Sequence, residues 1–176
     1  MQRQLGAQVT WLPFDLHPEY PPEGLPREQL LARYGPGMTS RVREFFESRG
    51  LRYNPNPDVV PNSLRAQQLT ELARDLGRHA PVHDRLMDAY WSEAQDIGNA
   101  DVLHRLAREL ELPETDVEEV LGGDRYRDRI EDSTRQAASI GANAVPAFLL
   151  DRRLLVLGAQ PNDAFEHAFA RLEQAP

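Results

Sequence analysis

The first residues with a spacing suited to chemistry are two histidines, His79 and His83, which stand four positions apart. On a helix this spacing can bring two imidazoles together as a metal-binding pair. Pro81 stands between them and favours a helix that begins here, so the two side chains are predicted to straddle a helix start rather than share a face. The sequence pattern indicates no third metal ligand, and we expect no metal site. The other histidines are isolated and are interpreted as surface or core-edge residues: His17, His104 and His167.

Carboxylates are abundant, with 28 Asp and Glu residues, but their pattern does not indicate acid–base catalysis. Most fall on the polar faces of predicted helices, often beside arginine. The stretch DRYRDRIED, residues 124–132, favours ion pairs four residues apart on a solvated helix face. No nucleophile-elbow, dinucleotide-binding or P-loop pattern occurs. We therefore predict no catalytic residue and no cofactor in this chain.

The residue types that are missing exclude several kinds of chemistry. The 176 residues contain no cysteine, which excludes disulfides, thiolate nucleophiles and thiolate-bound metals. All basic residues are arginine, so lysine chemistry is excluded as well. The formal net charge of −8 argues against nucleic acids and anionic membranes as partners. Because no apolar run approaches the ~18 residues of a membrane span and no signal peptide is visible, we expect a soluble, cytoplasmic protein.

One proline occupies an unusual position. Pro146 stands directly before an apolar stretch, AFLLD, which turns through residues 151–153 into a second stretch, LLVLG. Proline donates no backbone hydrogen bond, so it is tolerated at the first residue or at the edge of a strand. Either it opens a strand with an ordinary trans bond, or the Val145–Pro146 bond is cis and shapes a surface. The residues alone leave both interpretations open.

The elements that would position these residues follow from hydrophobic periodicity. Residues 8–14 and the two stretches after Pro146 are rich in β-formers and predict strands. The intervening pattern is helical, with Asn62 predicted to cap one helix and Asn99 or Asp101 another. Strands at both ends with helices between them predict one α/β domain interrupted by a helical insertion. Helices are expected over residues 27–35, 39–50, 63–77, 82–95, 99–112, 113–123, 124–141 and 161–174.

Four stretches, taken in order, resemble a known family. They are VTWLPFDLHPEYPPEG, PNSLRAQQLTELARDLG, HDRLMDAYWSEAQDIGNADVLHRLARELEL and GANAVPAFLLDRRLLVLGAQPNDAFEHAF. The first resembles the second strand and following connector of the thioredoxin-like DsbA family, in its cytoplasmic FrnE-like branch. The next two are similar to helices of that branch's inserted domain. The last is similar to its cis-proline loop, terminal hairpin and final helix, so the resemblance covers nearly the whole chain.

The resemblance implies a fold and a binding site. The fold would be a thioredoxin-like α/β domain of the DsbA type, formed by residues 1–61 and 141–176, with a large α-helical insertion at residues 62–140. In such proteins the bond before the proline is cis, and the exposed backbone beside it receives an extended protein or thiol substrate. The resemblance thus implies a cis Val145–Pro146 bond and a substrate-binding role for Val145 and Pro146.

The resemblance also implies a gap at the start. The family begins with a strand, a C-x-x-C motif and a helix, and residues 1–8 align with the end of that helix. The first strand and helix, with their cysteines, are therefore expected to be missing. In a thioredoxin-like sheet the missing strand would lie between residues 9–14 and 148–150. Its absence would leave two open edges, which invite pairing with another chain, such as a second copy in a homodimer.

Three functions are compatible with this sequence. The first is a FrnE-type protein disulfide oxidoreductase or isomerase that is redox-inactive as this cysteine-free chain. The second is the related branch of kappa-class glutathione transferases and 2-hydroxychromene-2-carboxylate isomerases, which shares the fold. The third is a non-catalytic interaction module, in which the helical insertion and open sheet edges contact a partner protein.

Overall fold

The computed structural model describes residues 6–35 and 37–174, which gather into two compact units. One unit comprises Met1–Leu16 and Glu131–Pro176, and the other comprises His17–Ile130. These bounds differ from the predicted boundaries after residues 61 and 140, because residues 17–61 pack with the helices that follow them. The assignment of residues 1–61 and 141–176 to one thioredoxin-like domain, with 62–140 inserted, stays a prediction.

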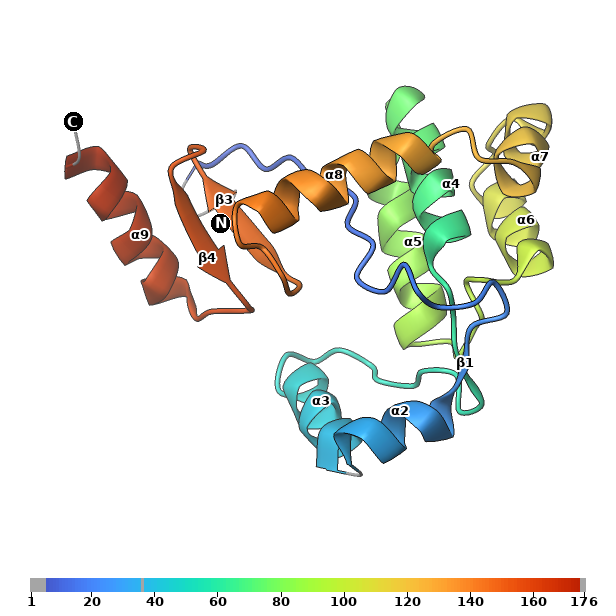
Figure 1. Cartoon of the computed structure of the whole chain (residues 1–176), viewed down its shortest axis with the longest axis horizontal. Helices are drawn as coiled ribbons and strands as arrows, with labels where there is room; N and C mark the ends of the chain where they lie inside the picture. The colour runs from blue at the N-terminus through green and yellow to red at the C-terminus, as the bar shows by residue number, and fades with distance from the viewer. Residues whose placement is uncertain (1–5, 36, 175–176) are drawn as a thin grey trace. The chain divides into compact units, whose positions relative to one another are not determined.

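Four helices form the core of the unit His17–Ile130, and a fifth begins in it (Figure 1). Apolar residues recur along each of the four at three- and four-residue spacing, which gives every helix an apolar stripe. The stripes meet in one buried cluster that includes Leu69, Leu103 and Val120, all fully shielded from solvent. The helices are α4 (Leu64–Asp75), α5 (His79–Trp91), α6 (Ala100–Glu109), α7 (Glu114–Gly122) and α8 (Arg127–Ser139).

Asparagine side chains accept hydrogen bonds from the first amides of two of these helices. The Asn99 Oδ1 atom accepts hydrogen bonds from the amides of Asp101 at 2.8 Å and Val102 at 3.3 Å, which confirms Asn99 as the predicted cap of α6. The N-cap position of α4 is Ser63 rather than the predicted Asn62, and the Ser63 side chain caps no amide. Asn62, one residue earlier, accepts from the Leu64 amide at 2.9 Å through its Oδ1 atom. Both asparagines thus satisfy donors that the first helical turn leaves free.

Two polar side chains are fully buried in this unit, and both are hydrogen-bonded. The Gln68 Nε2 atom donates to the Gly123 carbonyl at 3.1 Å, and its Oε1 accepts from the Tyr126 amide at 3.1 Å. One turn further along α4, the buried Glu71 carboxylate accepts from Arg129 at 3.3 Å. These bonds tie α4 to the start of α8. They add directional contacts to the apolar packing within this unit.

The first part of the same unit is a small layer of two helices and two short strands. Gly24, which precedes β1, has a left-handed backbone (φ 79°), and an added Cβ would lie 2.5 Å from a carbonyl oxygen of β2. On the other side, Phe46 and Trp91 pack with ring centroids 5.1 Å apart, which joins α3 to the end of α5. The elements are β1 (Leu25–Pro26), α2 (Arg27–Tyr34), α3 (Gly37–Glu47) and β2 (Val59–Val60), with β1 and β2 antiparallel.

The other unit holds an antiparallel hairpin, β3 (Ala147–Leu150) and β4 (Leu154–Leu157), followed by α9 (Asn162–Gln174). Its strands and closing helix confirm the prediction for this part of the chain. The predicted strand at residues 8–14 is wrong, because these residues form no strand in the structure. A strand needs a hydrogen-bonded neighbour, and the sheets of the described residues contain only β1–β2 and β3–β4. None of the helices in the described part is long and apolar enough to cross a membrane.

Candidate functional site

The loop between α8 and β3 contains the residues predicted to bind substrate. Gly141 ends the α8 region with a left-handed backbone (φ 86°), and the chain then reaches Val145 and Pro146. The Val145–Pro146 peptide bond is cis, in agreement with the prediction. The Val145 side chain is 53% exposed, so an apolar group stands in solvent at the mouth of the hairpin.

Hydrogen bonds fix this loop to the end of the hairpin. The Gly158 amide donates to the Pro146 carbonyl at 2.8 Å, and Gly158 has the left-handed backbone (φ 78°) that glycine adopts at low cost. At the opposite end, the Arg153 amide donates to the Leu150 carbonyl at 3.0 Å and closes the turn. The loop is therefore held at its base, directly before the first residue of β3.

The register of the hairpin decides which backbone groups remain available. Because Pro146 and Gly158 form a hydrogen-bonded pair, Phe148 and Leu150 also direct their amides and carbonyls toward β4. Ala147 and Leu149 direct theirs away from β4. Within the described residues no strand pairs with this edge of β3. The edge continues directly from the exposed Val145 and offers two amides and two carbonyls to an incoming strand.

The two faces of the hairpin differ in what covers them. Phe148 packs edge-on against Phe165 of α9, with ring centroids 4.9 Å apart, and Leu150 on the same face is buried. On the other face Leu149 is 47% exposed and Leu157 is 39% exposed. An exposed apolar face next to an unpaired strand edge is characteristic of a surface that binds another polypeptide.

The remaining candidate residues do not form a reactive site. His79 and His83 both lie on α5, with parallel rings 5.6 Å apart, so the prediction that they straddle a helix start is wrong. Pro81 is accommodated in the first turn, where its missing amide costs no hydrogen bond. Burial lowers the pKa of both histidines. The described residues contain no group of three or more potential metal ligands.

His17 and the acidic stretch at residues 124–132 make ring-stacking and ion-pair contacts. His17 stacks on Tyr20 with ring centroids 4.4 Å apart and contacts Glu19 at 3.0 Å. In residues 124–132, Arg127 pairs with Asp124 at 2.7 Å, three positions away rather than the predicted four. Further arginines of this stretch pair across helices, with acidic residues of α4 and α7. The stretch is therefore an ion-pair surface, and no acid–base dyad is formed.

Sequence reasoning located the loop, and the family resemblance predicted an open strand edge at residues 148–150, but neither showed which backbone groups of that edge are available. Val145 and Pro146 are adjacent in sequence, so a local motif locates them. The availability of Ala147 and Leu149 depends on hairpin register and on the absence of a second neighbour, which no short pattern encodes. The two-residue period of a strand predicts that Phe148 and Leu150 share one face and that Ala147 and Leu149 share the other, but AFLL is apolar throughout, so its residue types do not tell which face is covered.

Comparisons with known proteins agree on one family. The sequence model of the DSBA-like thioredoxin domain matches residues 1–170. The Bacillus subtilis protein YwbO is 26% identical over 166 residues, which are 93% of this chain and 82% of YwbO. The solved structure of a probable DsbA oxidoreductase from Streptomyces coelicolor superposes with a TM-score of 0.87 at 26% identity, covering 99% of this chain and 79% of that one.

A cytosolic disulfide reductase, DsbM from Pseudomonas aeruginosa, is similar in fold, with a TM-score of 0.62 at 23% identity over 87% of this chain and 81% of that chain. These similarities account for the helical unit and for the hairpin with its preceding loop. The architecture is thus an α/β, DSBA-like thioredoxin fold with a helical insertion. The chain belongs to the family of proteins with a DSBA-like thioredoxin domain.

Proposed function

We propose that this chain binds an extended protein segment at Val145, Pro146 and the neighbouring edge of β3, as the substrate-binding part of a FrnE-type disulfide oxidoreductase or isomerase. The observation that carries the proposal is the unpaired edge of β3 beside the exposed Val145. A segment that adds as a strand gains backbone hydrogen bonds from Ala147 and Leu149. Its apolar side chains gain contacts with the exposed face of the hairpin.

The proposal assigns binding, and no redox step, to the residues of this chain. Exchange between a dithiol and a disulfide proceeds by attack of a thiolate on a disulfide sulfur. The 176 residues contain no cysteine to supply that thiolate. We expect the pure chain to give no turnover of a dithiol or disulfide substrate above the buffer rate, and measurable turnover would overturn this part of the proposal.

The relatives support a cytoplasmic setting and name a second candidate ligand. DsbM is described as cytosolic, and it has also been solved with GSH. A glutathione-binding function, as in the kappa-class transferase branch, would use the same loop. Saturable binding of glutathione that is lost when Val145 is replaced would favour this second candidate over a protein segment.

A binding experiment tests the main proposal. A fluorescein-labelled peptide with alternating valine and threonine should raise its fluorescence anisotropy in the presence of the chain, whereas a proline-interrupted peptide of similar composition should not, because proline donates no amide hydrogen. Val145→Glu and Leu149→Glu should weaken binding at least tenfold. Leu76→Glu, on the helical unit and 40% exposed, is the matched control. Equal binding by all three variants would contradict the proposed site.

A second copy of the chain is the competing occupant of the same edge. Sedimentation equilibrium separates the two cases, since a homodimer through β3 would dissociate when the peptide is added. A dimer that persists at saturating peptide would show that self-association uses another surface.

A further inference from the structure

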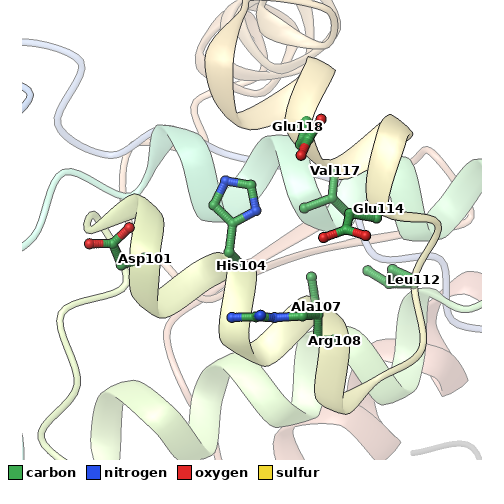
Figure 2. Close-up of a pocket in the computed structure, with 8 residues that line it drawn as sticks. All are labelled: Asp101, His104, Ala107, Arg108, Leu112, Glu114, Val117 and Glu118. Carbon is green, nitrogen blue, oxygen red and sulfur yellow. The ribbon is translucent and has the colours of Figure 1, made fainter.

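A groove between α6 and α7 holds facing charges that no other residue neutralises. Its volume is about 440 Å³, within the ~300–1,000 Å³ range of small-molecule sites. His104 and Arg108 project into it from α6, while Glu114 and Glu118 project from α7 (Figure 2). Neither Arg108 nor the two glutamates has an ion-pair partner within 4.0 Å among the described residues. The walls thus present opposite charges that remain unpaired across the groove.

The arrangement along α6 adds a second acidic end. Asp101, His104 and Arg108 recur at three- and four-residue spacing, so they share one face of the helix. Arg108 lies seven positions after Asp101, so their Cα atoms are about 10.5 Å apart along the helix axis. In Figure 2 the Arg108 side chain runs back along α6, which gives the groove a basic group beside His104 and an acidic group at the Asp101 end.

Negative charge is concentrated at the Asp101 end. Asp101 also lines a neighbouring hollow of about 420 Å³, whose other acidic residues are Glu23 and Asp96 and whose basic residue is Arg65. The first groove itself carries three carboxylates against one guanidinium. The apolar lining of the groove consists of little more than buried side chains of α6 and α7. Charge, rather than apolar contact area, therefore determines which ligand the groove can bind.

From this geometry we infer that the α6–α7 groove binds a basic α-amino acid of the lysine type. The ligand's α-carboxylate pairs with Arg108, and its α-ammonium pairs with Glu114 or Glu118 on the facing helix. Its side-chain cation extends toward Asp101. The inference does not depend on the proposed function, because it uses a different unit of the chain.

Ligands that each lack one charge test the pairing directly. Isothermal titration with L-lysine should show saturable binding. L-norleucine, which lacks the side-chain ammonium, and cadaverine, which lacks the carboxylate, should each bind at least tenfold more weakly. Equal affinity for L-lysine and L-norleucine, or no saturable binding of L-lysine, would overturn the inference.

Two substitutions locate the site on the groove. Glu118→Gln and Arg108→Gln should each reduce the affinity for L-lysine at least tenfold, while Arg41→Gln, on the exposed surface of α3, should leave it unchanged. Glu118 lies outside the first turn of α7, so its neutralisation has little effect on helix stability. Unaltered lysine binding by Glu118→Gln, in a variant whose thermal melt matches the original chain, would place any lysine site elsewhere.

Discussion

Replacing Gln68 by leucine should destabilise the helical unit without creating a cavity. The two side chains are similar in size, but leucine makes neither of the hydrogen bonds that join Gln68 to Gly123 and Tyr126. The Tyr126 amide lies in a buried position, and leaving such a donor unsatisfied costs about 1–3 kcal/mol. Gly123 is exposed, so its carbonyl can bond to water instead. We therefore expect the free energy of unfolding to fall by about 1–3 kcal/mol.

Urea unfolding measures this loss in one unit of the chain. Trp91 lies in the helical unit and Trp11 in the other, so a Trp11→Phe background lets Trp91 fluorescence report on the helices alone. The midpoint should fall while the slope with urea stays the same, as expected when only stability changes. Gln67→Leu, one position earlier on α4, is the control, because Gln67 is half-buried and bonds only to the Ser63 hydroxyl at 3.1 Å, which water can replace. If Gln68→Leu lies within about 0.5 kcal/mol of Gln67→Leu, the hydrogen bonds contribute nothing and the reasoning is refuted.

Three further outcomes follow from local geometry. In urea melts, Gly24→Ala should lower the free energy of unfolding by at least about 2 kcal/mol more than Gly35→Ala. Both glycines have a left-handed backbone, but only a Cβ at position 24 would contact a carbonyl oxygen of β2. Equal losses of stability in the two variants would contradict this clash. Burial lowers the pKa of His79 and His83, so the unfolded chain binds more protons and stability should fall as the pH drops below about 6.5. Melts of the double His→Gln variant between pH 7 and 5 should show a smaller loss, and an identical loss would exclude these histidines as its cause. In urea melts, Asn99→Ala should lower the free energy of unfolding by about 1 kcal/mol, and Asn99→Asp should lower it much less. Equal losses in the two variants would rule out capping by the side-chain oxygen.

The elements that sequence patterns located well are those with local causes. Helix α6 carries its cap at Asn99 and its apolar stripe within one continuous segment, so both its start and its buried face follow from residue types. The same holds for the hairpin, where two apolar runs flank a short turn. The cis bond at Pro146 was suggested by family resemblance, since residue types alone left a trans bond equally open.

The errors arose where structure depends on distant neighbours. Residues 8–14 have strand-forming composition but lie unpaired in the described structure, and composition does not supply a partner strand. Pro81 suggested a break between His79 and His83, yet the first turn of a helix tolerates proline without loss of a hydrogen bond. The α6–α7 groove was not predicted, because its facing charges belong to two helices whose packing no local pattern describes.

Amide hydrogen exchange at β3, followed by NMR with and without the alternating valine–threonine peptide, tests the central claim most directly. In the free chain the amides of Ala147 and Leu149 should exchange faster than those of Phe148 and Leu150, which bond to β4. Saturating peptide should slow exchange at Ala147 and Leu149 and leave Leu155, on the opposite strand, unchanged. Bound peptide with no added protection at Ala147 and Leu149 would contradict strand addition at this edge.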